Sequence, residues 1–275
     1  MSDQTSIIGD LGVAVTFNAA IELERRISFL KEYLLTTGLR FFVLGISGGV
    51  DSTTAAMLAQ RAVRDLREAG HMVGFVAVRL PYGQQADEVD AQAALAAIGP
   101  DHLYTMNIKP AADAMLAEAK AAGLAFSGSA HEDFILGNIK ARQRMIAQYT
   151  LAGALGGLVI GTDHAAEAVM GFFTKFGDGA ADILPLSGLN KRRVRAIASL
   201  LGVPDRLVFK VPTADLENNA PLRPDEDAYG VTYEQIDDFL EGKPIDVAAQ
   251  ARIIQAYRAT SHKRAMPLAA SAVSP

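Results

Sequence analysis

A glycine-rich segment supplies the strongest chemical signal in the sequence. It reads Gly45-Ile46-Ser47-Gly48-Gly49-Val50-Asp51-Ser52-Thr53 and joins an apolar run to a stretch with helical spacing. Backbone amides at such a strand-to-helix turn converge at the positive end of the helix, where they bind anions. The segment contains neither Gly-Lys-Ser/Thr nor Gly-x-Gly-x-x-Gly, so it is neither a Walker loop nor a dinucleotide fingerprint. We therefore predict a phosphate-binding loop of another kind.

Asp51 is the unusual residue of this loop, because a carboxylate beside a phosphate is repelled unless a cation lies between them. A Mg²⁺ ligand is its natural role, since Mg²⁺ prefers oxygen ligands and substrate phosphates. The structural alternative is a turn in which glycines permit tight geometry and Asp51 caps the helix. The order Ser-Gly-Gly-x-Asp-Ser favours function, because it resembles the pyrophosphate loop of ATP pyrophosphatases.

Residues 161–167, Gly-Thr-Asp-His-Ala-Ala-Glu, repeat the pattern of a strand that ends in glycine and polar residues before a helix. Sites on open parallel sheets form at such strand ends. Glu167 is therefore a candidate for a second oxygen ligand of the same Mg²⁺ as Asp51. Thr162 is equally suited to an N-cap, and His164 alone is weak evidence for function.

A third polar segment spans residues 173–182 and carries Lys175, Asp178 and Asp182 among glycines. By itself, such a loop is most simply explained as solvated charge. Only a neighbouring site would give its residues a chemical role.

Alternating apolar and amphipathic segments must position these side chains. Buried strands are predicted at 41–46, 72–78, 103–108 and 158–161. Helices are predicted at 19–37, 50–69, 87–98, 110–122, 132–152, 165–170, 191–201, 233–240 and 247–260. Asn18 and Gly38 are suited to begin and end the first of these helices. Residues 210–230, with three prolines, are predicted to form a long loop.

Strand and helix alternation predicts an α/β fold: a doubly wound parallel sheet of about five strands, with helices on both faces. We see no linker that would divide the chain, so residues 1–275 are expected to form a single domain. In such a sheet the polar segments meet at the carboxyl edge.

Composition excludes several functional classes. The chain has 275 residues, no cysteine, and 26 Lys+Arg against 31 Asp+Glu, for a net charge of −5. Thiol catalysis and cysteine-based metal sites are impossible, and no overall basic footprint for nucleic acid exists. The longest apolar run, 151–161, is well short of the roughly 20 residues that span a bilayer. We expect a soluble cytoplasmic protein that binds neither nucleic acid nor membrane.

Taken together, these segments resemble the ammonia-dependent NAD synthetases, and they follow the order of that family along nearly the whole chain. The matching segments are 45–52, 78–83, 137–142, 161–167, 172–182, 212–216 and 261–264. The glycine-rich loop alone fits a superfamily, whereas its combination with Gly-Thr-Asp-His-Ala-Ala-Glu and Thr-Lys-Phe-Gly-Asp-Gly is far more specific.

The resemblance implies a ligase that forms a C–N bond in the last step of NAD biosynthesis. ATP adenylates the carboxylate of nicotinic acid adenine dinucleotide (deamido-NAD) and pyrophosphate leaves. Ammonia then attacks the acyl-adenylate and gives NAD and AMP. Mg²⁺ is the implied cofactor, and ATP is a co-substrate.

The resemblance also assigns residues. For ATP they are Gly45, Ile46, Ser47, Gly48, Gly49, Val50, Asp51, Ser52, Arg79, Thr162, Lys191 and Thr213. For Mg²⁺ they are Asp51 and Glu167. For deamido-NAD they are Asn138, Arg142, Lys175, Asp182, His262 and Lys263, with Phe134 as a neighbour of Asn138. The catalytic residues are Asp178, Lys191 and Asp51, of which Asp178 is the candidate base that deprotonates ammonium.

Two further expectations follow from the resemblance. Family members are homodimers with the dinucleotide site at the subunit interface, so Tyr33, Phe134 and Tyr149 are candidates to face a partner. A buried helix face is the alternative for each of them. Glutamine-using relatives need a glutaminase domain with a cysteine nucleophile. We expect no glutaminase domain in this chain, and free ammonia as its nitrogen source.

Two rival functions remain open on the sequence alone. Another pyrophosphate-loop ligase, such as a GMP synthetase core, an argininosuccinate-type ligase or a tRNA-modifying enzyme, would share the glycine-rich loop. A non-catalytic adenine-nucleotide-binding module would bind ATP without turnover. Residues 81–88 and 210–230 are candidate loops that close over ATP and exclude water from the acyl-adenylate.

Overall fold

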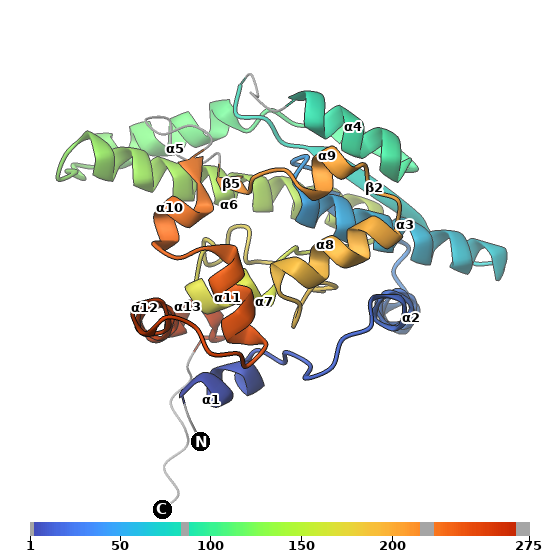
Figure 1. Cartoon of the computed structure of the whole chain (residues 1–275). Coiled ribbons are helices and arrows are strands. Elements are labelled where there is room, and N and C mark those ends of the chain that lie inside the picture. Colours follow the sequence, from blue (N-terminus) through green and yellow to red (C-terminus); the bar gives the residue numbers. More distant parts are fainter. Residues whose placement is uncertain (1–2, 84–87, 215–222, 268–275) are drawn as a thin grey trace, which may run out of the picture.

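The computed structural model of the chain describes residues 3–83, 88–214 and 223–267 (Figure 1). Its centre is a parallel four-stranded sheet with the order β3-β2-β1-β4. The strands are β1 (Phe41–Gly45), β2 (Gly74–Arg79), β3 (His102–Thr105) and β4 (Gly157–Val159). In the register, Phe42 of β1 lies between Phe75 of β2 and Leu158 of β4. Both central strands therefore present their carboxyl ends at one edge.

The predicted α/β fold with a parallel sheet is confirmed. The sheet has four strands where about five were expected. A single parallel bridge between Ile160 and Ile183 continues the sheet beyond β4, at the place where a fifth strand would run. The segment around Ile183 is too irregular to extend this pairing into a ladder, which is consistent with its glycine- and aspartate-rich sequence.

Helices cover both faces of the sheet, as predicted. Alternate residues of β1 point to opposite sides, since Phe42 and Leu44 belong to one apolar cluster and Val43 to another. The first face is covered by α2 (Ala19–Thr37), α3 (Val50–Glu68), α4 (Glu88–Ile98), α8 (Lys191–Leu200) and α9 (Asp205–Val208). The second is covered by α6 (Ser129–Leu155), against which α5 (Lys109–Ala121) packs.

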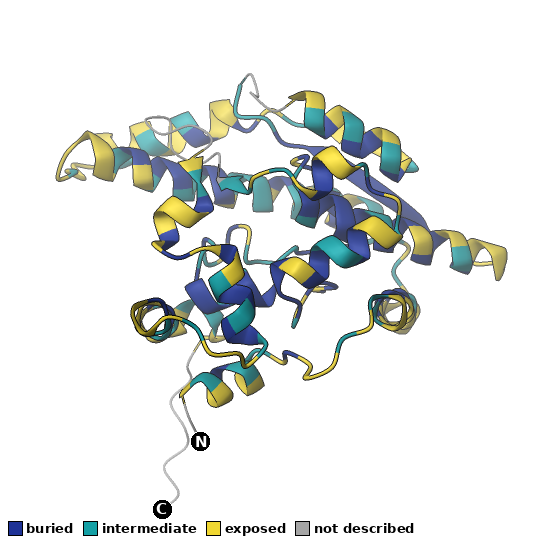
Figure 2. Cartoon of the chain, viewed as in Figure 1, coloured by how far each residue is buried: buried dark blue, intermediate teal, exposed yellow. Residues whose placement is uncertain are grey.

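A second, smaller core lies next to the sheet, at the lower part of Figure 1. It is formed by α1 (Asp3–Asp10), α7 (Ala165–Met170), α11 (Tyr233–Leu240) and α12 (Val247–Ala259). The last short helix, α13 (Ser261–Arg264), follows α12. Because α7 follows β4 directly, this core is tied to the carboxyl edge of the sheet. Figure 2 shows buried residues along the central strands and on the inward sides of the helices. The edge strand β3, predicted as buried, is exposed at all four of its residues.

Local capping explains where α2 begins and ends, as the sequence predicts. Asn18 Oδ1 accepts hydrogen bonds from the amides of Ala20 at 3.0 Å and Ile21 at 3.1 Å. Gly38 ends the helix with φ at 69°, a conformation that favours glycine. These two confirmed caps set the ends of the helix, whereas its face with Ile27, Leu30 and Leu34 is buried in the main core.

The segment 210–230, predicted as one long loop, contains three short elements. They are β5 (Thr213–Ala214), β6 (Arg223–Pro224) and α10 (Asp225–Tyr229), with β5 and β6 antiparallel. Residues 215–222 and 84–87, which belong to the two candidate closing loops, lie outside the described residues. Across the described ranges, no helix combines the length and apolar character needed to span a membrane.

Candidate active site

The glycine-rich loop connects β1 to α3 at the carboxyl edge of the sheet. Its entry is fixed by Gln148 of α6, whose Oε1 accepts a hydrogen bond of 2.7 Å from the Gly45 amide. Gly48 adopts φ +88°, and a Cβ there would lie 2.6 Å from the backbone nitrogen of Ala91. Only glycine fits this position, because both the backbone conformation and the approach of α4 exclude a side chain.

Hydroxyl groups of the loop are held at the N-terminus of α3. Ser47 Oγ lies 3.0 Å from Ser52 Oγ and accepts a hydrogen bond of 3.2 Å from the Gly49 amide. Thr53 Oγ1 donates to the Gly49 carbonyl at 2.8 Å. The loop is thus held in place by hydrogen bonds among its own residues, and its amides lie at a helix N-terminus, where anions bind.

A cavity of about 460 Å³ opens beside this loop. It brings together the loop, the end of β4, residues 171–180 and the segment around β5 and β6. Predicted site residues that line it are Gly45, Ile46, Ser47, Gly49, Val50, Asp51, Ser52, Phe134, Asn138, Thr162, Glu167, Asp178, Thr213 and Lys263. Three polar segments that are distant in sequence therefore meet around one space large enough for a nucleotide.

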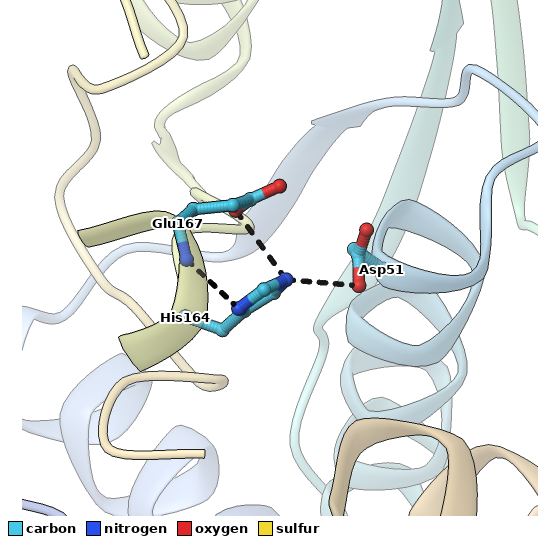
Figure 3. A group of neighbouring side chains, drawn as sticks. All are labelled: Asp51, His164 and Glu167. Carbon is cyan, nitrogen blue, oxygen red and sulfur yellow. Dashed lines mark hydrogen bonds and ion pairs between the residues drawn. The ribbon is translucent and has the colours of Figure 1, made fainter. Parts of the chain in front are cut away.

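Two carboxylates that line the cavity, Asp51 and Glu167, form a cluster with an imidazole and an ammonium group. His164 and Lys191, which supply these two groups, are buried and do not belong to the cavity lining, although Lys191 is predicted to contact ATP. Lys191 Nζ, at the start of α8, lies 2.8 Å from Asp51 Oδ2. His164 Nε2 lies 3.4 Å from Asp51 Oδ1 and 3.6 Å from Glu167 Oε2. Figure 3 shows the His164 ring between Asp51, on α3, and Glu167, on α7. The two carboxylates predicted to share a metal therefore do face one region.

The charges of this cluster depend on one another. Burial opposes ionisation of Asp51, but the charges of Lys191 and His164 hold the pKa of this carboxyl far below its usual range. Burial, with the nearby Asp51 charge, raises the pKa of Glu167. For Lys191, the attraction of Asp51 and Glu167 outweighs burial and raises the pKa. The cluster thus contains a firmly ionised Asp51–Lys191 pair and a second carboxylate without a full counter-charge.

The donor set fits a divalent cation. Asp51, His164 and Glu167 each offer a ligand atom, and these atoms lie within 4.8 Å of one another. Asp51 Oδ1 is buried and accepts no hydrogen bond from the residues that the structure describes. A free carboxylate oxygen beside a second carboxylate with a raised pKa is the arrangement that a hard cation such as Mg²⁺ would stabilise.

Arg79, predicted to contact ATP, does not line the cavity. Its Nη1 donates to the Ile46 carbonyl, and its Nη2 lies 2.7 Å from Glu88 Oε2. Only 3% of the side chain is exposed. Arg79 therefore connects the glycine-rich loop, at Ile46, to the start of α4, at Glu88. Gly48 is also absent from the cavity lining, because its inward face packs on α4.

Four residues predicted to bind deamido-NAD lie outside the cavity lining: Arg142, Lys175, Asp182 and His262. Lys175 Nζ donates to the carbonyls of His262 at 2.6 Å and Ala265 at 3.0 Å. Asp182 Oδ2 accepts from the Val159 amide at 2.7 Å. Their contacts within the chain are structural, and their substrate roles stay predictions.

Asp178 and Lys263 both line the cavity, and their charges interact. Asp178 Oδ1 accepts a hydrogen bond of 2.9 Å from the Thr174 amide. Lys263 Nζ donates to the carbonyls of Gly171 at 2.9 Å and Phe173 at 3.0 Å. Behind them, burial and the Asp178 charge raise the pKa of Asp163 to about 7. Asp163 and Asp178, beside the Lys263 ammonium group, are side chains of the kind that transfer protons in general acid–base catalysis.

Sequence reasoning missed several residues that line the cavity: Gln148, Phe172, Phe173, Lys210 and Asp225. Asp225 is 7% exposed, and its Oδ2 accepts a hydrogen bond of 2.9 Å from the Tyr233 hydroxyl. It lies in the segment predicted as a loop, where aspartate is common. Gln148 lies on a long helix whose inward polar residues carry no local signature. Neither residue had a signal in the sequence.

Comparisons with known proteins agree on one family. A family model described as NAD synthase matches residues 22–267. An NH(3)-dependent NAD(+) synthetase from Burkholderia mallei (strain SAVP1) is 63% identical over 262 residues, which cover 95% of this chain and 92% of that protein.

Solved structures give the same result. The NAD+ synthetase from Burkholderia pseudomallei has a TM-score of 0.83 and 61% identity, and the match covers 96% of both chains. An NMN synthetase from Francisella tularensis has a TM-score of 0.80 and 36% identity, and covers 93% of this chain and 100% of that one. These matches confirm the resemblance that the motifs indicate. The chain belongs to the NAD synthase family.

Proposed function

We propose that this chain catalyses the ATP-dependent amidation of deamido-NAD by ammonia, which yields NAD, AMP and pyrophosphate. Membership in the NAD synthase family supports this reaction, and one observation of the structure carries it. The glycine-rich loop and two facing carboxylates, Asp51 and Glu167, meet on the wall of one cavity. A phosphate site beside a cation site is what adenylation by ATP requires.

The first step is proposed to form an acyl-adenylate. A carboxylate oxygen of deamido-NAD attacks the α-phosphorus of ATP, and the bond to the β-phosphate oxygen breaks. Amides and hydroxyls of the loop, with Ser47 among them, bind the leaving pyrophosphate. The ammonium group of Lys191, adjacent to the loop, stabilises the negative charge that develops on the phosphates. Thr162 and Thr213, on the cavity wall, are proposed to contact ATP.

Mg²⁺ is the proposed metal, with Asp51 and Glu167 as its ligands. When bound, it would neutralise phosphate charge and orient the triphosphate. The free Asp51 Oδ1 and the raised pKa of Glu167 support this assignment. A cation at this position would remove the repulsion between the two carboxylates.

The second step is proposed to take place beside Asp178. Asp178 accepts a proton from ammonium, and the resulting ammonia attacks the acyl carbon. AMP leaves with one of the original carboxylate oxygens, and the attacking nitrogen releases a second proton to solvent as the amide forms. Lys263 and Asn138, which line the same cavity, are proposed to bind the dinucleotide. Arg142, Lys175, Asp182 and His262 are proposed to extend that site beyond the cavity.

A homodimer would complete this extended site. On the exposed side of α2, the rings of Phe29 and Tyr33 stack with their centroids 6.5 Å apart. Phe29 is 45% exposed, and Ile146 of α6 is 49% exposed. We propose that this aromatic surface contacts a second copy of the chain. Tyr33→Glu should shift the sedimentation of the protein from dimer to monomer, and an unchanged dimer would argue against this surface.

Free ammonia is the proposed nitrogen source. The 275 residues contain no cysteine, so they hold no thiol nucleophile that could release ammonia from glutamine. Product analysis with ATP and deamido-NAD tests the function. We expect NAD with ammonium and little NAD with glutamine alone.

The substrate needs a separate control, because one structural relative is an NMN synthetase. Replacing deamido-NAD by nicotinic acid mononucleotide should reduce turnover strongly. The lower identity of that relative, 36% against 61–63% for the NAD synthetases, supports the dinucleotide. Faster amidation of the mononucleotide would reverse the assignment.

A further inference from the structure

His164 is fully buried in the carboxylate cluster, yet neither step of the proposed reaction uses it. Its side chain has 0% exposure. Its two ring nitrogens contact different partners. Nδ1 lies 3.4 Å from the amide of Glu167, which donates to it and so caps α7. Nε2 points away from the helix end and into the cluster (Figure 3).

The cap fixes what the other nitrogen can do. Because Nδ1 accepts the hydrogen bond from the Glu167 amide, the ring presents Nε2 to the cluster. That nitrogen faces Asp51 Oδ1 at 3.4 Å and Glu167 Oε2 at 3.6 Å. A single ring nitrogen therefore lies between the two carboxylates that are the proposed metal ligands.

Each oxygen of Asp51 has a nitrogen neighbour in this arrangement, although only Oδ2 accepts a hydrogen bond from the described residues. Lys191 Nζ contacts Oδ2 at 2.8 Å, and His164 Nε2 faces Oδ1. Nζ and Nε2 are themselves 3.2 Å apart. The Asp51 side chain thus lies between two nitrogen groups. One belongs to Lys191, the first residue of α8, and the other to His164, the N-cap of α7. The orientation of Asp51 toward Glu167 does not depend on α3 alone.

A capping role by itself does not explain these contacts. Asparagine, aspartate, serine and threonine are the preferred N-cap residues, and all are smaller than histidine. The imidazole places a second polar atom where a short capping residue would have none. The cost of burying that atom is offset by its polar neighbours in the cluster, which are the two carboxylates and Lys191 Nζ.

We propose that His164 is a positioning residue that sets the separation and orientation of Asp51 and Glu167 for a divalent cation. This inference rests on the proposed function, because it assumes that both carboxylates bind the metal. Groups that orient metal ligands typically change metal affinity or activity by about 10- to 100-fold when they are removed. His164 also links α7 to α3, which carry the two ligands.

Two substitutions separate the proposed role from a capping role. H164N keeps an acceptor near the Nδ1 position and so preserves the cap, but it loses the Nε2 contact. H164Q places a side-chain N–H near the Nε2 position and loses the short capping acceptor. Binding of Mn²⁺ alone to the full-length protein, followed by electron paramagnetic resonance, is the measurement.

We expect H164N to weaken Mn²⁺ binding about 10-fold or more, and H164Q to remain within about 3-fold of the wild type. The opposite order would show that capping is the only role of His164 and would overturn the proposal. Equal binding in all three proteins would overturn it as well. Circular dichroism confirms that each variant is folded.

If H164N does not fold, H164A with added imidazole replaces it. Imidazole should then strengthen Mn²⁺ binding several-fold, and no change would contradict a positioning role. Release of pyrophosphate by the wild type, dependent on deamido-NAD, is measured in parallel. Its absence would reject the proposed function, whereas normal release with unaltered Mn²⁺ binding in the variants would reject the role of His164 alone.

Discussion

Lys191 Nζ lies 2.8 Å from Asp51 Oδ2, although 140 residues separate the two in sequence. The lysine side chain is 1% exposed and the aspartate side chain 19%. The pair joins the start of α8 to the start of α3. It places the ammonium group of Lys191 beside the carboxylate of Asp51, which is also a proposed metal ligand. It therefore couples the stability of the fold to the electrostatics of the site.

Lys191→Met should abolish turnover and destabilise the fold. Removing one partner of a buried pair costs about 3 kcal/mol, because the other charge stays behind without compensation. Mg²⁺ should restore more stability to this variant than it gives the wild type, since it would replace the missing charge at Asp51. Thermal unfolding with and without Mg²⁺ is the measurement.

The matched control is Lys31→Met. Lys31 Nζ lies 3.3 Å from Asp65 Oδ2, and the lysine side chain is 33% exposed. Its removal should therefore lower the free energy of unfolding by less than about 1 kcal/mol. If Lys191→Met were as stable as Lys31→Met, the buried pair would not have the role assigned to it.

Asp51→Ala should eliminate turnover while the protein stays folded. The substitution removes one of the two proposed metal ligands, and no other described carboxylate shares its contact with Lys191 Nζ within 4.0 Å. Steady-state release of pyrophosphate, with circular dichroism as the folding control, gives the answer. Activity close to that of the wild type would exclude Asp51 as a ligand.

Gly48→Ala should destabilise the loop, whereas Gly49→Ala should not. At Gly48, φ is +88° and a Cβ would meet the Ala91 nitrogen at 2.6 Å. The backbone conformation alone costs an alanine roughly 1–2 kcal/mol, and the collision adds to it. At Gly49, φ is −78° and a Cβ would meet only Ser47 Oγ, at 3.4 Å.

Denaturant unfolding of the two variants tests this difference. Gly49→Ala should lie within about 0.5 kcal/mol of the wild type, so any loss of its activity would come from contact with the ligand. Equal stability of the two variants would show that α4 does not constrain the loop.

Asp163→Asn should stabilise the protein at alkaline pH. Burial and the charge of Asp178 raise the pKa of Asp163 to about 7, above its ordinary value of 3.8. The native state therefore retains a proton that the unfolded state has lost, and the stability from this group decreases as the pH rises from about 4 to about 7.

Asparagine resembles the protonated acid and is not subject to this loss. The variant should gain up to about 4 kcal/mol over the wild type at pH 8, because the pKa is raised from 3.8 to about 7 and each pKa unit is worth about 1.4 kcal/mol. The gain should be smaller at pH 5. Thermal unfolding of both proteins across this range is the test, and a gain that does not change with pH would contradict the shifted pKa.

The parts of the site that follow directly after a buried strand could be predicted from the sequence. The glycine-rich loop and the segment that ends in Glu167 each follow a buried strand, and parallel strands bring such ends to one edge. The α/β fold, its helices on both faces and the family follow from the same signals. The capped ends of α2 were also predictable, because Asn18 and Gly38 act within one turn of it.

Other features depend on packing between distant elements, and no local pattern encodes them. Arg79 lies at the end of β2 near the loop, but its guanidinium is held by Ile46 and Glu88 behind the cavity. Asp225 enters the cavity from a segment with the composition of a loop. Whether a charged side chain faces ligand or protein is decided by which neighbours reach it, and that is set by the tertiary fold.

The acyl-adenylate is the centre of the account, and the fate of the carboxylate oxygens tests it most directly. Deamido-NAD labelled with ¹⁸O in its nicotinate carboxylate is incubated with the enzyme, ATP, Mg²⁺ and ammonium, and the products are analysed by mass spectrometry. We predict one ¹⁸O atom in AMP and one in the new amide of NAD, because the bond that breaks joins the acyl carbon to the oxygen bound to phosphorus. Unlabelled AMP, or ADP with phosphate in place of AMP with pyrophosphate, would contradict the account.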